Sequence, residues 1–113
     1  MKTLKNILYK VSIESVIGST DRSIAALQYD SRRIEADAVF VAIKGGVLDG
    51  HTFISKAIEL GASVIVCQEL PEETVNTVTY IKVENSQKAL AVMASNFYGN
   101  PSENLKLIGI TGT

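Results

Sequence analysis

The segment from residue 38 to residue 67 reads AVFVAIKGGVLDGHTFISKAIELGASVIVC and contains the pattern that decides the fold class. Val39–Ile43 and Ser63–Cys67 are short apolar runs, which are typical of strands covered on both faces of a parallel sheet. Between them, residues 51–60 place apolar side chains at helical spacing, and Gly61 follows where this helix should end. The segment therefore predicts a strand, a helix and a second strand.

The rest of the chain continues this alternation. A short amphipathic helix is predicted near the start, and a longer helix capped by Asn85 or Ser86 is predicted to end before Gly99. Further strands are expected at residues 24–29, 78–83 and 105–110. This order predicts an α/β fold with a small, mostly parallel sheet flanked by helices.

The composition suits a folded domain and argues against several classes of protein. Of the 113 residues, 46% are hydrophobic and 20% are charged, which is ordinary for a globular chain and wrong for a disordered one. The formal net charge of -1 gives no basic excess for phosphate backbones, so no nucleic-acid partner is expected. One cysteine excludes an intrachain disulfide and a cysteine-rich zinc site, and Cys67 is expected in the core.

The first ten residues do not have the pattern of a targeting segment. Lys5 and Lys10 interrupt every apolar stretch there, so no signal peptide is expected. No run approaches the ~20 apolar residues of a membrane span, so no membrane insertion is expected. The sequence therefore predicts a cytoplasmic protein.

Ligands of open parallel sheets bind at the loops that follow the carboxyl ends of the strands. Two loops meet this condition, residues 30–32 and residues 45–51. In the first, the Ser31 hydroxyl can donate to a phosphate or ribose oxygen. In the second, Gly45 and Gly46 let backbone amides approach a ligand that a side chain would obstruct. Both loops are therefore candidates for a binding site.

Simpler explanations remain open for the same residues. Asp30 and Ser31 are an ordinary turn pair whose side chains bond their own backbone, and Arg32 could only pair with a nearby acid. A single histidine at a helix start is more often a cap or a packing residue, so His51 is assigned no catalytic role. Asp49 is expected to cap that helix.

The last five residues, GITGT at 109–113, directly follow an apolar run. A phosphate-binding loop begins in this way, with a buried strand followed by glycines whose backbone amides close on an anion. On its own, the pentapeptide is better explained as a glycine-containing turn after a strand.

In combination, and in this order, several blocks of the sequence resemble the Mur ligase family, most closely its MurE subfamily. The blocks are Tyr29–Arg33, Val39–Gly45, Asp49–Ile54, Phe97–Ser102 and Leu107–Thr113. The resemblance covers about residues 20–113. It implies a Rossmann-like N-terminal domain at residues 1–104, which binds the UDP-sugar. It also implies that residues 105–113 are the first strand and the start of the phosphate loop of a truncated ATP-binding domain.

The resemblance also implies which residues contact ligands. The substrate-binding positions that it implies for the UDP-MurNAc moiety are Tyr29, Ser31, Gly46, Val47 and Leu48. The Tyr29 ring could lie on the uracil face or simply fill the edge of the core. The incomplete phosphate loop for ATP is implied at Gly112 and Thr113, and neither a catalytic residue nor a metal site is expected in this chain.

The sequence departs from the family pattern at two places. Val47 and Leu48 are apolar where relatives often carry polar side chains, so uracil recognition would depend on backbone groups or apolar packing. Asp37-Ala38 replaces the usual Gly-Asp before the strand at Val39, and Asp37 can adopt a left-handed turn conformation.

The activity that the resemblance implies belongs to the full-length parent. MurE enzymes use ATP and Mg²⁺ to add the third amino acid, diaminopimelate or lysine, to UDP-MurNAc-L-Ala-D-Glu in peptidoglycan biosynthesis. The implied partner is therefore the UDP-MurNAc-dipeptide. The 113-residue chain alone is expected to bind no cofactor and to be inactive as a ligase. Two alternatives remain open, a MurF-type ligase that adds a dipeptide and a non-catalytic α/β interaction module.

Overall fold

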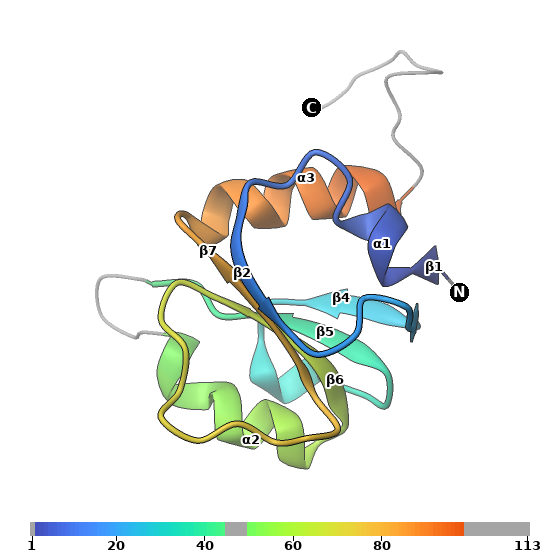
Figure 1. The fold of residues 1–113 in the computed structure, drawn as a ribbon. Coiled ribbons are helices and arrows are strands. Elements are labelled where there is room, and N and C mark those ends of the chain that lie inside the picture. The colour runs from blue at the N-terminus through green and yellow to red at the C-terminus, as the bar shows by residue number, and fades with distance from the viewer. Residues whose placement is uncertain (1, 45–49, 99–113) are drawn as a thin grey trace.

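The computed structural model describes residues 2–44 and 50–98, which form an α/β fold (Figure 1). The helices are α1 (Leu4–Ile7), α2 (Ile54–Glu59) and α3 (Ser86–Phe97), with 3-10 turns η1 (Ser31–Arg33) and η2 (Gly50–Phe53). The strands are β1 (Lys2–Thr3), β2 (Ile13–Ile17), β3 (Ser23–Ile24), β4 (Ala26–Gln28), β5 (Ala38–Val41), β6 (Ala62–Cys67) and β7 (Thr79–Val83).

The main sheet has five strands in the order β2-β7-β6-β5-β4. The four strands from β4 to β7 are parallel, and only β2 runs antiparallel, against β7. This topology confirms the predicted mostly parallel sheet. A separate pair, β1 and β3, lies antiparallel beside it.

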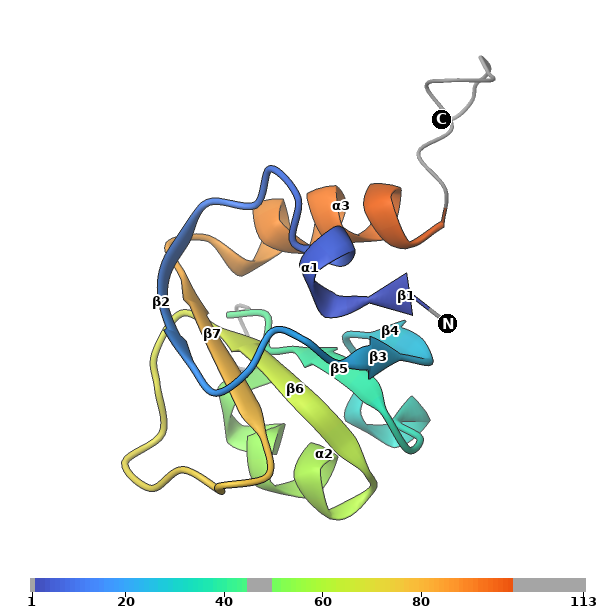
Figure 2. The same ribbon diagram turned by 45° about the vertical axis from the view of Figure 1, so that its right-hand side comes forward.

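Helices cover both faces of the sheet, so its central strands are buried on both sides (Figures 1 and 2). On one face, α1 and α3 pack against Val39, Val64 and other alternate residues of the strands. On the other face, α2 packs against Phe40 and Ile65. All four residues of β5 and all six of β6 are buried, which explains why both strands are continuous apolar runs in the sequence.

Helix α3 begins where its cap was predicted. The Asn85 side chain accepts a hydrogen bond from the Lys88 amide at 3.0 Å, and the Gln68 side chain accepts one from the Ser86 amide at 2.9 Å. These bonds satisfy donors that the first turn of a helix leaves unpaired. Met93 is fully buried on the inner face of this helix.

Two turns at the amino end of the sheet have left-handed backbone. Asp37 has φ 63°, so it adopts the left-handed conformation that an aspartate tolerates. Gly61 has φ +116° and ends α2, and a Cβ there would lie 2.9 Å from the Ala36 Cα. The Asp37 amide donates to the Gly61 carbonyl at 3.1 Å, so the two turns support each other.

The structure also corrects the sequence prediction. The strand expected at residues 24–29 is divided, because β3 pairs with β1 while β4 pairs with β5, and the chain changes partner at Ala25. Strand β2 was not predicted, since its side chains are exposed or half-buried and form no apolar run. The helix expected at residues 51–60 starts as the 3-10 turn η2. The strand expected at 105–110 lies outside the described residues.

Cys67 lies at the end of β6 and is fully buried, which confirms its predicted place in the core. Burial raises the pKa of its thiol to about 11. Within residues 2–44 and 50–98, no helix is long and apolar enough to cross a membrane.

Candidate functional site

A cavity of about 450 Å³ opens where β4 and β5 end. These strands are parallel neighbours, with Gln28 opposite Phe40, so the segments that leave their carboxyl ends also lie side by side. The first segment lines the cavity with residues 29–32, and the second with Ile43, Gly50 and Phe53. The structure therefore brings residues 30–32 of the first candidate loop and Gly50 of the second to one place.

The turn after β4 is held by Asp30. Its carboxylate accepts from the Arg32 amide at 2.9 Å and caps η1, while the Arg32 guanidinium donates to both carboxylate oxygens at 3.1 and 2.9 Å. Hydrogen bonds from Arg32 lower the pKa of Asp30 from 3.8 to about 2, and the pKa of Arg32 is raised by the same contact. Asp30 is thus a turn-forming residue paired with Arg32. This agrees with the simpler explanation of these residues, which was an ordinary turn with an arginine paired to a nearby acid.

We expect the Asp30 carboxyl to titrate far below its ordinary range. Because its folded pKa is depressed, the turn contact should be intact above pH 3.8 and should be lost as the pH falls toward 2. A carbon-detected NMR titration should show a midpoint near 2 for this carboxyl. Arg32→Ala should move the midpoint toward 3.8, and a wild-type midpoint already at 3.8 would contradict the ion pair.

The two predicted residues on this turn differ in exposure. Ser31 is 8% exposed and is the first residue of η1, so its position in the cavity wall is fixed by the turn. Tyr29 is 65% exposed at the rim, which excludes the alternative that its ring fills the edge of the core. A solvent-exposed aromatic ring beside a cavity can stack on a flat ligand.

The opposite wall is closed at its base by Gly50. Its amide donates to the Ile43 carbonyl at 2.7 Å, and a Cβ at this position would lie only 2.6 Å from the Ile43 nitrogen. Only glycine permits so close an approach of the two backbones. The predicted residues Gly46, Val47 and Leu48 and the predicted helix cap Asp49 lie outside the described residues.

Sequence reasoning missed Ile43 and Phe53 as cavity residues, and it included Gly50 in the candidate loop at residues 45–51 without giving it a role of its own. Gly50 looked like part of a helix start, because the pattern showed an acidic residue followed by glycine and histidine. Ile43 and Phe53 looked like core residues, and both are in fact partly buried against hydrophobic clusters as well. The signal that could have identified Gly50 is its position within the second candidate loop, which was expected beside the first at one edge of the sheet.

His51 follows Gly50 but does not line the cavity. Its Nε2 accepts hydrogen bonds from the Gln68 amide at 2.9 Å and the Glu69 amide at 3.3 Å. This contact agrees with the prediction of a packing or capping residue. The phosphate-loop positions Gly112 and Thr113 lie outside the described residues.

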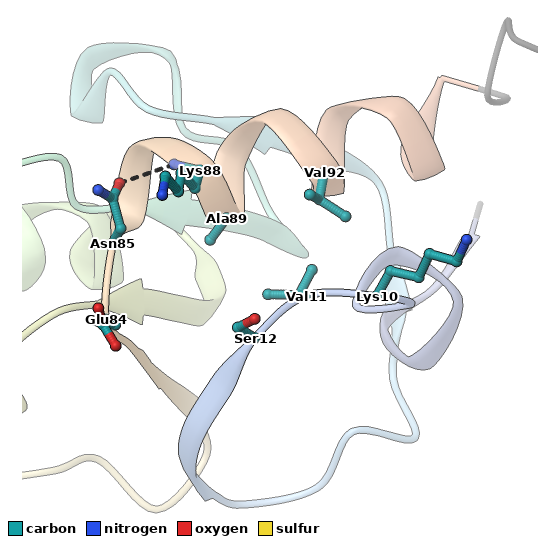
Figure 3. Close-up of a pocket in the computed structure, with 8 residues that line it drawn as sticks. All are labelled: Lys10, Val11, Ser12, Glu84, Asn85, Lys88, Ala89 and Val92. Carbon is teal, nitrogen blue, oxygen red and sulfur yellow. Dashed lines mark hydrogen bonds between the residues drawn. The ribbon is translucent and has the colours of Figure 1, made fainter.

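A second groove of about 340 Å³ lies at the carboxyl end of β7, between the start of α3 and residues 10–12 (Figure 3). Val11 and Val92 face each other across the groove. Asn85, which caps the start of α3, lies at one end of the groove. No residue that the sequence singled out as ligand-binding lines this groove. It provides a place for matched control substitutions.

The first cavity is equipped to bind a ligand. It presents a buried serine, an exposed aromatic ring and an arginine held by a carboxylate, next to a backbone turn closed by glycine. Within the described residues, no group of three or more His, Cys, Asp or Glu side chains could hold a metal ion. The exposed Tyr29 ring and the Ser31 hydroxyl suit recognition of a polar ligand that carries a flat ring.

Comparison with known proteins gives relatives of high similarity. The chain is 48% identical over 111 residues to the UDP-N-acetylmuramoyl-L-alanyl-D-glutamate--2,6-diaminopimelate ligase of Cytophaga hutchinsonii. It is 50% identical over 110 residues to a ligase of the same name, numbered 1, from Clostridium acetobutylicum. Each alignment covers 97% of this chain and 23% of the relative's length.

A solved structure and a family model agree with these relatives. The crystal structure of MurF ligase from Thermotoga maritima in complex with ADP is 36% identical with a TM-score of 0.54, over 66% of this chain and 17% of that one. The model described as "Mur ligase family, catalytic domain" matches residues 23–98, more than half of the chain. The chain therefore belongs to the Mur ligase family.

Proposed function

We propose that this chain binds the UDP-MurNAc end of a peptidoglycan precursor in the cavity between residues 29–32 and Gly50. The observation that carries the proposal is the meeting of these two segments at the carboxyl edge of the sheet. This is where open α/β sheets bind their ligands. The relatives support the choice of ligand, because their name contains a UDP-N-acetylmuramoyl substrate.

Each predicted residue is assigned one role in this proposal. The Ser31 hydroxyl donates to a diphosphate oxygen, and the Tyr29 ring stacks on the uracil face. The Arg32 guanidinium donates to both oxygens of the Asp30 carboxylate, so this pair holds the turn that carries Tyr29 and Ser31 and is assigned no contact with the ligand. Backbone groups at Gly46, Val47 and Leu48 would supply the donor and the acceptor that uracil needs.

We further propose that the parent is an ATP-dependent ligase of the cytoplasm that joins a third amino acid to UDP-MurNAc-L-Ala-D-Glu. Gly112 and Thr113 would begin its phosphate loop, and ATP with Mg²⁺ would supply the phosphoryl group that activates the substrate carboxylate. The relatives at 48% and 50% identity favour diaminopimelate as the added amino acid, and they favour this activity over that of MurF. The chain alone is proposed to be inactive as a ligase.

Calorimetric titration with UDP tests the binding proposal. Ser31→Ala should weaken UDP binding about tenfold, because a hydrogen bond to a charged group is lost. Ser12→Ala is the matched control, since Ser12 lines the groove beside α3, and it should leave the affinity unchanged. A wild-type chain that does not bind UDP would favour the interaction module, and weaker binding by Ser12→Ala would place the ligand in the other groove.

A further inference from the structure

The wall of the cavity formed by Gly50 is attached to the strand in the middle of the sheet. His51 Nε2 lies 2.9 Å from the Gln68 amide nitrogen and 3.3 Å from that of Glu69. At the other end of the same loop, Lys44 Nζ lies 2.7 Å from a carboxylate oxygen of Glu69. Both ends of the loop are therefore tied to the residues that follow β6.

These residues form a firm point of attachment. All six residues of β6 are buried, and the strand is paired on both edges by β5 and β7. Gln68 is held further by its side chain, which accepts from the Ser86 amide at the start of α3. A group bonded to the Gln68 amide is consequently fixed to both the sheet and a helix.

Of the two attachments, the histidine is the stronger. The side chains of Lys44 and Glu69 are 49% and 67% exposed, and exposed ion pairs contribute little because water and salt screen them. The bond from Gln68 to His51 is partly buried, so its loss would leave an amide without its acceptor. The geometry requires an unprotonated Nε2 that presents a lone pair to the two amides.

We propose that His51 is a positioning residue for the UDP-sugar pocket, an inference that rests on the proposed function. It does not line the cavity, but its neighbour Gly50 does, and Gly50 in turn fixes Ile43 through their backbone hydrogen bond. Because His51 is bonded to the residues that follow β6, it keeps the adjacent Gly50 and its contact with Ile43 in place before the ligand arrives. Such preorganisation raises affinity without a direct contact.

Two loss variants and one rescue variant test this role in the 113-residue chain. His51→Phe keeps a ring but removes the acceptor, and it should weaken UDP binding about tenfold. Amide exchange at Gly50, read by NMR without ligand, should become faster by a similar factor. His51→Gln restores an acceptor oxygen and should recover most of the affinity. His51→Leu is the loss variant to use if His51→Phe does not fold.

Thr79→Val controls for a general loss of stability. It removes the bond from the Thr79 hydroxyl to the Ser19 carbonyl, 2.7 Å long, at the opposite end of the sheet, and should leave UDP affinity unchanged. Unchanged UDP affinity in His51→Phe, or no rescue by His51→Gln, would overturn the role of His51 and leave the proposed UDP-binding function standing. Unchanged Gly50 exchange in His51→Phe would overturn it whether or not UDP binds. If the wild-type chain fails to bind UDP, the proposed function falls, and the role of His51 in it falls too.

Discussion

Replacing Gly50 by alanine is expected to weaken UDP binding by roughly tenfold to a hundredfold while the sheet stays folded. The new Cβ would lie 2.6 Å from the Ile43 nitrogen and 2.9 Å from its oxygen, and these backbone atoms cannot rotate away as a side chain can. The two segments must separate, which breaks the 2.7 Å hydrogen bond at the base of the loop. Calorimetric titration with UDP measures the loss.

Gly61→Ala is the matched control for this prediction. It introduces the same methyl group into another tight turn, where the Cβ would meet the Ala36 Cα at 2.9 Å and the backbone has φ +116°. That turn lies at the amino end of β6, so the change should lower stability but leave the UDP affinity of the folded protein unaltered. Equal affinity losses in both variants would show that Gly50 acts through general stability and not through the cavity.

Replacing Phe40 by alanine is expected to lower the free energy of unfolding by about 3–5 kcal/mol. Phe40 is 1% exposed and lies in β5, between β4 and β6, where its ring packs in the hydrophobic cluster beneath α2. This loss of stability has two parts: the transfer free energy of burying a large apolar side chain is lost, and a cavity remains in the core. A domain of this kind has about 5–15 kcal/mol of stability in total, so the variant should be marginal or unfolded. Urea unfolding followed by circular dichroism measures the change.

Tyr98→Ala provides the contrast for Phe40→Ala. Tyr98 is also aromatic but is 69% exposed after the end of α3, and surface changes of this kind are usually within about 0.5 kcal/mol. A similar loss of stability in the two variants would contradict the assignment of the core to the strands of the sheet. A folded Phe40→Ala should retain a weakened pocket, because β5 leads directly to Ile43.

The sequence predicted the strands and helices whose buried residues form a recognisable apolar pattern along the chain. Strands β5 and β6 are covered on both faces and therefore appear as the apolar runs that include Val39 and Val64. Strand β2 leaves no such pattern, because it lies at the edge of the sheet with Val16 42% exposed. The break at Ala25 is decided by which strands pair, and that depends on segments far apart in the sequence.

The candidate site was predicted in the same partial way. Ser31 and Tyr29 came from a motif, and the structure places both beside the cavity. Ile43 and Gly50 were missed as a pair, since their close backbone approach is a tertiary contact that no local pattern reveals. The role of His51 likewise depends on Gln68, which lies on another loop.

The most direct test of the UDP-sugar pocket is an NMR titration of the isotope-labelled chain with UDP-MurNAc-L-Ala-D-Glu, with the amides assigned. If the UDP-sugar binds in this pocket, the largest shift changes will cluster at residues 29–32, Ile43, Gly50 and Phe53, and Ser12 and Lys88 in the other groove will be unaffected. No shift changes, or changes centred on Ser12 and Lys88, would contradict it.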